Sequence, residues 1–359
     1  MNIFCMNRLL AWPAGLLPAT LILTSVTAIQ SQQARNPLVV TSTNDASANA
    51  VLVFKLSGEG GSSLELAQTL PTHGKGGAST NAGIVQFEGN LGAVANYGSN
   101  SVTQLVREGN GIAITATIPL AADCAKPDSV ALSSDHLFVV GANCAESHAW
   151  PWGFLDGPVV SLPDTSAAQI AVGENWAAVT LTSGSLLQLP LTREGGVLNG
   201  SSNPVALPSD ANMVPLGAAF WKNVLGFTPA HSPDSFAIVD ESGQVNAVPG
   251  PAPSYPVNAP CWVAKGKGNV WYTGNSPGRA ISIFFSDSQG GVFYKSVSLP
   301  GSPTDITVSH DGKWLAVIYG AASNAYVAVY SIDHYGDLTH VATSSAIGVA
   351  SFSGVAFSE

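Results

Sequence analysis

The chain alternates between short apolar runs and clusters of turn-forming residues along almost its whole length. The clearest example is the stretch 303–343. Asp-Gly, Gly-Asp and small-residue turns divide it into four apolar runs, at 303–309, 313–319, 326–332 and 338–343. Runs of this length, bounded by Gly, Pro, Asn and Asp, are typical of β-strands. Four in succession predict a small antiparallel sheet.

The same four-strand unit recurs along the sequence. The preceding copy opens with Ala259-Pro-Cys-Trp-Val-Ala, and earlier copies begin near Gly83, Pro127, Gln169 and Pro215. The starts are roughly 41 to 48 residues apart, which is the period of four-stranded β-propeller blades. A single blade cannot bury both of its faces, so it packs against its neighbours around a common axis.

The two ends of the chain together supply one more blade. Residues 37–42 and 51–56 match the second and third strands of a unit, and no first strand precedes them except the N-terminal segment. Residues 348–358 match a first strand and then stop. Joining the two predicts an all-β, seven-bladed propeller in which the C-terminal strand completes the N-terminal blade, which removes free sheet edges. The alternatives are an open stack of sheets and a six-bladed ring.

Residues 1–28 have the pattern of an export signal. Arg8 precedes a mostly apolar stretch at 9–26, and small residues around Ala28 suit cleavage. The alternative is a membrane anchor, although proline and glycine interrupt the stretch, which is barely long enough to span a bilayer. We expect a secreted protein, extracellular or periplasmic, whose folded domain is 29–359.

Few residues of the chain are charged, and acidic residues predominate. Charged residues make up 10% of the chain, against about 25% in a typical soluble domain. Removal of 1–28 takes away one of the 13 basic residues and none of the 23 acidic ones, which leaves a net charge of −11. An acidic surface repels phosphate, so we expect no nucleic-acid partner and no membrane association after signal removal.

Three cysteines remain after removal of the signal: Cys124, Cys144 and Cys261. Export permits disulfides. Cys124 and Cys144 flank one hydrophobic strand pair, so we predict that they are bonded and that Cys261 is an inert thiol rather than a nucleophile. No CxxC, CxxCH or HExxH spacing is present, and we expect neither a metal site nor a cofactor.

Three segments stand out beyond the repeat: Asn96-Tyr-Gly-Ser-Asn-Ser-Val-Thr, Ala259-Pro-Cys-Trp-Val-Ala and Ser309-His-Asp-Gly-Lys-Trp-Leu-Ala-Val. They resemble the lactonase-like seven-bladed propellers, a group that includes 6-phosphogluconolactonase and the fungal 3-carboxymuconate cyclases. The resemblance implies the same fold, a substrate funnel on the axis, and a Pro-His pair ahead of an inner strand. Here the matching position after Pro127 is Asp128.

In propellers, the loops leading into inner strands and the loops between second and third strands meet at one end of the axis. We predict that Glu146 and His148, which lie together in the expected loop 143–148, form an acid–base pair there. His231, in a loop stiffened by two prolines, is a third candidate for proton transfer. The turn containing His310 is expected at the opposite end.

Five further residues are candidates for substrate binding. Arg279 and Lys126 suit a substrate carboxylate, and Asn275 lies in a loop of the same end. Asp128 and Asp305 sit at matching positions ahead of inner strands, where the alternative is a structural carboxylate that bonds neighbouring backbone.

Two hypotheses follow for the function. The first is an enzyme of lactonase or cycloisomerase type that acts on a small carboxylated or lactone substrate in the axial funnel. The second is a non-catalytic exported propeller that binds a small molecule, a glycan or a protein. We expect a small-molecule ligand and a monomer in either case.

Overall fold

The computed structural model describes residues 36–78, 82–209, 213–230, 234–249, 259–287, 290–348 and 352–359. These residues belong to one unit, Arg35–Glu359, and form seven four-stranded sheets. The helical elements among the described residues are two short 3-10 turns, η1 (Glu59–Gly61) and η2 (Tyr97–Ser99).

We number the sheets as blades in chain order and give their strands from the axis outwards. Blade 1 contains β28 (Ser353–Ser358), β1 (Leu38–Ser42), β2 (Ala50–Ser57) and β3 (Ser63–Pro71). Blade 2 contains β4 (Val85–Glu88), β5 (Leu91–Asn96), β6 (Ser101–Glu108) and β7 (Gly111–Pro119). Blade 3 contains β8 (Ser129–Leu132), β9 (His136–Gly141), β10 (Cys144–Ala149) and β11 (Val160–Ser161). Blade 4 contains β12 (Ala167–Val172), β13 (Trp176–Leu181), β14 (Ser185–Pro190) and β15 (Asn203–Pro204).

The remaining blades have the same order. Blade 5 contains β16 (Pro215–Trp221), β17 (Val224–Pro229), β18 (Asp234–Val239) and β19 (Val245–Pro249). Blade 6 contains β20 (Pro260–Lys265), β21 (Val270–Asn275), β22 (Ala280–Asp287) and β23 (Gly290–Ser298). Blade 7 contains β24 (Ser302–Val308), β25 (Trp314–Ala321), β26 (Asn324–Ile332) and β27 (Leu338–Thr343).

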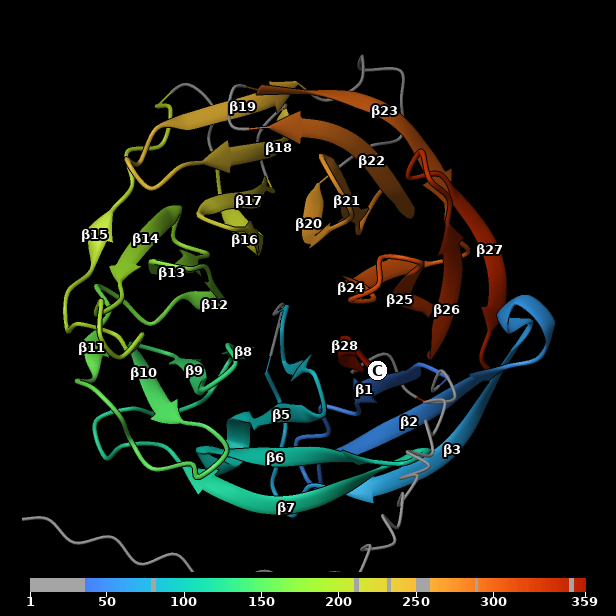
Figure 1. The fold of residues 1–359 in the computed structure, drawn as a ribbon, viewed down its shortest axis with the longest axis horizontal. Coiled ribbons are helices and arrows are strands. Elements are labelled where there is room, and N and C mark those ends of the chain that lie inside the picture. The colour runs from blue at the N-terminus through green and yellow to red at the C-terminus, as the bar shows by residue number, and fades with distance from the viewer. Residues whose placement is uncertain are drawn as a thin grey trace, which may run out of the picture. The chain divides into compact units, whose positions relative to one another are not determined.

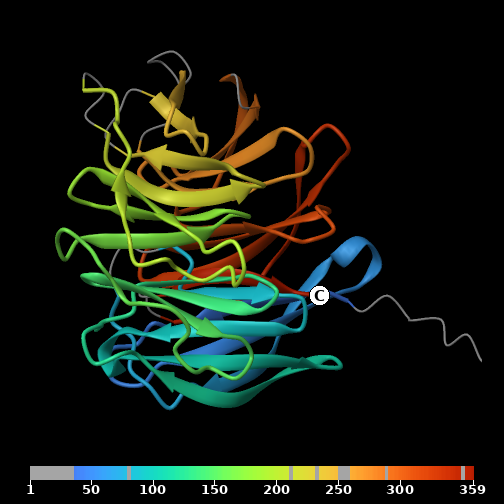
Figure 2. The ribbon, with the colours of Figure 1, turned by 60° about the vertical axis from the view of Figure 1, so that its left-hand side comes forward.

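The seven blades form a closed ring (Figure 1). Each inner strand contacts the inner strands of the two neighbouring blades, in the order β28, β4, β8, β12, β16, β20, β24 and back to β28. In the turned view the blades lie side by side around this ring (Figure 2). The fold predicted from the repeat is therefore confirmed. The inner strands of blades 2 to 7 begin within about two residues of the predicted starts, whereas β28 begins at Ser353, later than the predicted start at Gly348.

The split blade is confirmed as well. β28 pairs antiparallel with β1, so that Val39 lies opposite Phe357 and Val40 opposite Ala356. The buried side chain of Arg107, from blade 2, bonds both partners through Ser358 O and Asn36 O. The closure is therefore fixed by a ladder of backbone hydrogen bonds and by a guanidinium on the adjacent blade.

The core lies between the blades, and this explains the apolar runs in the sequence. In β1, Val39 packs into a cluster with Ile318 and Val327 of blade 7. Its neighbour Val40 packs into a different cluster with Val94 of blade 2. Successive strand residues point to opposite faces, and both faces of a blade are buried, so the strands have continuous apolar runs rather than an alternation.

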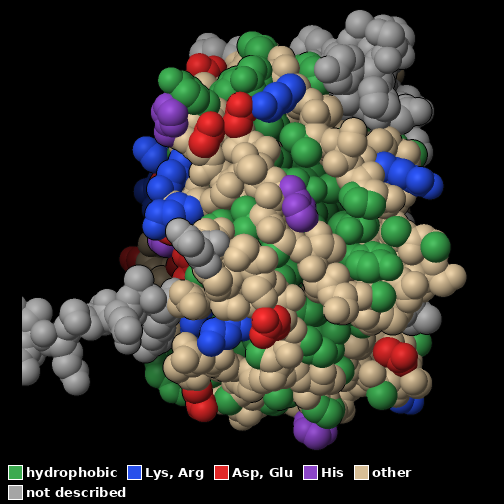
Figure 3. All heavy atoms as spheres, turned by 90° about the vertical axis from the view of Figure 1, so that its right-hand side faces the viewer, with side chains coloured by type: hydrophobic (Ala, Val, Ile, Leu, Met, Phe, Trp, Pro, Cys, Tyr) green, Lys and Arg blue, Asp and Glu red, His purple; other side chains and the backbone are tan. Residues whose placement is uncertain are grey.

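The surface agrees with the low charge of the sequence. On the side drawn in Figure 3, uncharged polar and hydrophobic side chains cover most of the face, with small groups of charged ones between them. No described helix has the length and hydropathy needed to cross a bilayer. The predicted signal, 1–28, lies outside the described residues and stays a prediction.

Candidate functional site

A cavity of about 220 Å³ lies on the propeller axis and is lined by the inner strands of blades 2 to 7. Most of its lining side chains are Ala, Val, Ile or Leu. Its polar lining residues are Gln86, Gln169, Lys265, Asp305 and Thr307. These are the groups that can contact a ligand on the axis.

Asp305 is the most unusual group of the cavity wall. Its carboxylate is buried and accepts hydrogen bonds from three backbone N–H groups: Ile306 at 2.8 Å, Val355 at 3.1 Å and Gly83 at 3.4 Å. Burial raises the pKa of Asp305 to about 7, although these hydrogen bonds act in the opposite direction. The group therefore exchanges a proton near neutral pH.

The hydrogen bonds of Asp305 connect three blades, since its partners belong to β24, β28 and the segment before β4. The hydrogen bonds therefore show Asp305 as a structural carboxylate that bonds neighbouring backbone, which was the alternative to substrate binding. A substrate contact by the same carboxyl stays a prediction.

Asp305 belongs to a layer of equivalent positions, one per inner strand. It pairs with Ile318, the fifth residue of its second strand. By the same criterion Ser129, Gln169 and Trp262 are its equivalents in blades 3, 4 and 6. The expected match between Asp305 and Asp128 is therefore wrong by one residue, because the strand register places Ser129 there.

This layer fastens neighbouring blades together. The Gln169 amide accepts from Ala218 N at 2.7 Å and donates to Ala218 O at 3.0 Å. Trp262 Nε1 donates to Pro303 O of the next blade at 2.8 Å. The polar side chains at this level of the axis thus replace backbone pairing between inner strands.

Lys265 lies on the cavity lining at the far end of β20. Its ammonium donates to Gly266 O at 2.6 Å and Gly268 O at 2.7 Å. It also lies 5.4 Å from the ring centre of Trp221 and 5.1 Å from that of Trp271. Burial lowers the pKa of Lys265 to about 8, so the cavity wall has a second group that titrates near neutral pH.

A second cavity, of about 380 Å³, shares Gln86, Thr307 and Val308 with the axial one. Its other lining residues include three with ionisable side chains, Glu88, His310 and Glu359. Burial raises the pKa of Glu359. His310 does lie in the turn between the first and second strands, as expected, but this end of the axis also has a hollow with ionisable groups.

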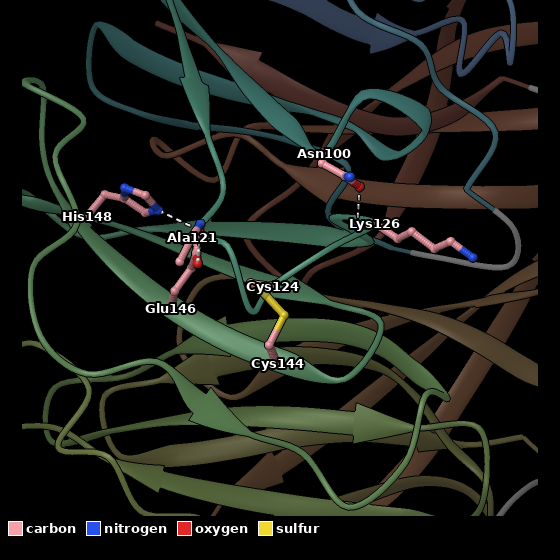
Figure 4. Close-up of a disulfide and its surroundings, with 7 residues drawn as sticks. All are labelled: Asn100, Ala121, Cys124, Lys126, Cys144, Glu146 and His148. Carbon is pink, nitrogen blue, oxygen red and sulfur yellow. Dashed lines mark hydrogen bonds and ion pairs between the residues drawn. A yellow bond between two sulfur atoms is a disulfide. The ribbon is translucent and has the colours of Figure 1, made fainter.

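Glu146 and His148 do form a pair, but in a place other than the one predicted. They lie in strand β10, not in a loop, because the loop that precedes this strand is only Ala142 and Asn143. Both are buried, and His148 Nε2 lies 2.8 Å from Glu146 Oε1 (Figure 4). Glu146 Oε2 accepts from Ala121 N of the segment leading out of blade 2 at 3.1 Å.

The pair does not face the axis. β10 is the third strand of its blade, and neither residue lines the axial cavity. Ala145, between Cys144 and Glu146, packs into the core with blade 4, so Glu146 and His148 point into the interface with blade 2. The loop predicted at 143–148 is therefore wrong, because Cys144–Ala149 continue the sheet as its third strand in spite of their polar side chains.

The other predicted site residues lie apart from one another. His231 lies outside the described residues. Arg279 and Lys126 are exposed, with φ values of 47° and 57° in loops; Lys126 N donates to Asn100 Oδ1 at 2.8 Å. Asn275 is buried, where its amide donates to Ser282 Oγ at 2.7 Å and accepts from Thr273. Asp128 is buried next to the start of β8.

The expected end of the propeller is incompletely described. The segments leading into β4, β16, β20 and β28 each contain residues outside the described part. Among the predicted site residues that the structure describes, Asp305 alone lies on the wall of the axial cavity.

Sequence reasoning missed Gln169 and Lys265, although both had a signal. Each is the polar residue of an otherwise apolar inner strand, Ala-Ala-Gln-Ile-Ala-Val and Pro-Cys-Trp-Val-Ala-Lys. Counting residues from the second strand of each blade would have aligned Gln169 with Asp305.

Two of the three cysteines predicted to remain after signal removal are bonded in the structure. Cys124 and Cys144 form a disulfide between the segment leading into β8 and the start of β10 (Figure 4). This bond was predicted, and it is compatible with an extracellular location. Cys261 is free, and burial raises the pKa of its thiol, which disfavours the nucleophilic thiolate. The described residues contain no group of three or more His, Cys, Asp or Glu side chains arranged to hold a metal ion.

Comparison with known proteins shows the fold. No family model and no curated protein sequence matches the chain. A protein from Lactobacillus plantarum is similar in structure, with a TM-score of 0.67 and 13% identity over 90% of this chain and 100% of that one. A candidate 6-phosphogluconolactonase from Bacteroides fragilis has a TM-score of 0.65 and 12% identity over 92% and 99%. Virginiamycin B lyase from Staphylococcus aureus has a TM-score of 0.59 and 17% identity over 77% and 90%. The chain is thus a seven-bladed propeller that resembles the 6-phosphogluconolactonase-like propellers.

Proposed function

We propose that the chain is an exported enzyme of lactonase or cycloisomerase type, acting on a small carboxylated or lactone substrate in the axial cavity. The observation that supports it best is Asp305, a buried carboxyl group on the wall of that cavity with a pKa of about 7. A general acid–base group works best when its pKa lies near the operating pH. Groups perturbed in this way concentrate at functional sites.

The hydrogen bonding of Asp305 leaves room for this role. A carboxylate offers about four lone-pair positions, and the three backbone N–H groups occupy three of them. In lactone hydrolysis the carboxylate would take a proton from water as the water oxygen bonds to the ester carbon. The ring C–O bond then breaks, and the proton passes to the alkoxide that leaves. The net reaction adds one water and needs no redox partner.

The size of the space supports a small substrate. The axial cavity and the adjoining one measure about 220 and 380 Å³, within or just below the range of about 300–1,000 Å³ that is usual for small-molecule sites. A small number of fixed polar groups on the wall is also usual for such sites. Lys265 supplies a positive charge at the lining of the same cavity.

A panel of γ- and δ-lactones and of muconate-type dicarboxylates tests the proposal, with hydrolysis followed by acid release and cyclisation by absorbance. We expect turnover of at least one compound, with kcat/KM rising through an inflection near pH 7 as Asp305 ionises. Asp305→Asn should abolish turnover, and Asp240→Asn, a turn carboxylate in blade 5, should leave it unchanged. Turnover that survives in Asp305→Asn would refute the role of this carboxyl.

The alternative function is a non-catalytic exported propeller that binds its ligand without turnover. The observation that favours it is the position of Glu146 and His148, which lie between blades instead of on the cavity wall. Binding of a panel compound by calorimetry, with no product after prolonged incubation, would select this alternative.

A further inference from the structure

We propose that two exposed aromatic side chains on blade 3, Trp152 and Phe154, form a binding surface for carbohydrate. We call this pair the aromatic platform. It lies in the connection between β10 and β11, at the outer part of the blade, and it shares no residue with the cavities on the axis. The inference is therefore independent of the proposed reaction.

The platform exposes far more apolar surface than is usual for such residues. Trp152 is 76% and Phe154 60% exposed, and Leu155 beside them is 45% exposed. The two rings are inclined by only 24°, with their centres 6.5 Å apart. Grouped apolar exposure of this kind marks interaction sites on soluble proteins.

The loop that carries the platform is fastened to the propeller at several points. Ala149 N donates to Phe154 O at 2.9 Å, and Gly153 N donates to Ala149 O at 2.7 Å. From blade 2, Gln104 Nε2 donates to Pro151 O at 2.9 Å. A side chain presented by a fixed backbone loses less entropy when it binds a ligand.

The buried pair Glu146 and His148 helps to hold the platform loop, and His148 is the positioning residue. His148 Nδ1 lies 3.0 Å from Gly153 O, and its Nε2 faces Glu146 at 2.8 Å. A carbonyl oxygen can only accept, so Nδ1 carries a proton and donates it to Gly153. The chain of contacts Ala121–Glu146–His148–Gly153 thus links blade 2 to the residue between the two platform rings.

The exposed area argues for a small, flat ligand rather than a protein. A large aromatic side chain buries about 150–250 Å², so the exposed parts of the two rings offer about 300 Å². A stable protein interface needs about 800 Å² per partner. One or two sugar rings match the smaller area, and their flat C–H faces carry the partial positive charge that an aromatic face attracts.

Exposed carboxylates also occur on two segments that adjoin the platform loop, one along the chain and one through a backbone hydrogen bond. Asp156 follows Phe154 by two residues, and the backbone oxygen of Asp135 accepts from Trp150 N at 2.8 Å. Both carboxylates flank the ring of His136, and their side chains are 44% and 71% exposed. Exposed carboxylates accept hydrogen bonds from sugar hydroxyls, whereas they repel anionic lipid and nucleic acid.

Tryptophan fluorescence offers a direct test, because Trp152 is the exposed tryptophan among those that the structure describes. The probes are β-linked hexasaccharides of glucose, N-acetylglucosamine, mannose and xylose. We expect at least one to protect the fluorescence from acrylamide quenching, and Trp152→Ala to weaken its binding in calorimetry by about tenfold or more. Tyr335→Ala, which removes another exposed aromatic on blade 7, is the matched control and should bind like the wild type.

His148→Ala should raise acrylamide quenching of Trp152 in the free protein and weaken the same binding, and His148→Gln, whose amide can donate to Gly153 O, should partly restore both. The proposal is overturned if no hexasaccharide binds, or if Trp152→Ala binds as well as the wild type. Two other results would also overturn it, if they occur while no glycan binds. One is that Trp152→Ala abolishes self-association in sedimentation. The other is that Trp152→Ala abolishes adsorption to vesicles of neutral phosphatidylcholine.

Discussion

Asp305→Asn should change how the stability of the propeller depends on pH. In the folded protein the carboxyl has a pKa of about 7, against an ordinary value of 3.8. The folded state therefore holds a proton that the unfolded chain has already released between these two values. By proton linkage, the free energy of unfolding falls as pH rises through this window, by about 1.4 kcal/mol per pH unit.

The magnitude follows from the same two values. The full contribution is present below pH 3.8 and is lost by the time the pH has passed about 7, and the loss amounts to about 4 kcal/mol at 1.36 kcal/mol per pKa unit. Asparagine does not titrate, so the variant should lack this loss. Other titrating groups are common to both proteins and cancel in the difference.

The assay is urea denaturation of wild type and Asp305→Asn at several pH values between 4 and 8. The difference between their free energies of unfolding should shift by about 4 kcal/mol across this range, in favour of the variant at high pH. Asp240→Asn is the control, because the pKa of Asp240 is shifted in the opposite direction. A hydrogen bond from the Ser242 side chain lowers the pKa of Asp240, so its contribution is lost only as pH falls below the ordinary value.

Parallel profiles for wild type and Asp305→Asn would refute the reasoning. If the variant fails to fold, proton uptake during refolding of the wild type near pH 5.5 gives the same information. The buried carboxyl should then take up close to one proton beyond the number that the other groups account for.

Three further predictions concern the architecture. Deletion of 348–359 removes β28 and exposes β1, so cooperative thermal unfolding should be lost; an unchanged transition would contradict the closure. Replacing both Cys124 and Cys144 by Ser opens a link that spans 20 residues and should cost about 3 kcal/mol in denaturant titrations, whereas unchanged midpoints would show that the bond does not stabilise. Gly217→Ala places a Cβ 2.8 Å from backbone atoms of Cys261 to Val263, which cannot move aside, so it should destabilise by about 1–3 kcal/mol. Gly195→Ala, with no contact below 3.4 Å, should be neutral, and equal effects of the two substitutions would argue against tight packing between blades 5 and 6.

The fold could be predicted because its signal repeats. Each blade buries both faces, so apolar runs and Gly or Pro turns recur at one period, and a weak pattern in one blade is supported by its neighbours. The C-terminal strand could also be predicted, since residues 348–358 match the first strand of the other blades. The disulfide could be predicted because Cys124 and Cys144 flank one hydrophobic strand pair in the sequence.

The site could be predicted much less well, for two physical reasons. A strand carrying Glu146, Ser147 and His148 contradicts the apolar pattern. These groups are satisfied inside the protein by the contact between Glu146 and His148 and by hydrogen bonds with other segments, which the sequence pattern does not reveal. The direction of a side chain toward the axis or toward a neighbouring blade also depends on register, and one residue reverses it. Asp305 was found as a polar residue at an inner strand, but its burial and its partners on blades 1 and 2 are properties of the assembled ring.

The pairing of β28 with β1 also sets the order in which the protein can fold. Thr41 bonds Gly354 across a sequence separation of 313 residues, whereas strands within blades 2 to 7 pair with near neighbours along the chain. Contacts at long separation form slowly, because the loop entropy must be lost before they contribute. We expect blades 2 to 7 to assemble first as an open arc with an unpaired edge at β1. Until β28 arrives, that edge is exposed to other chains, and this is the stage at which aggregation competes with closure of the ring.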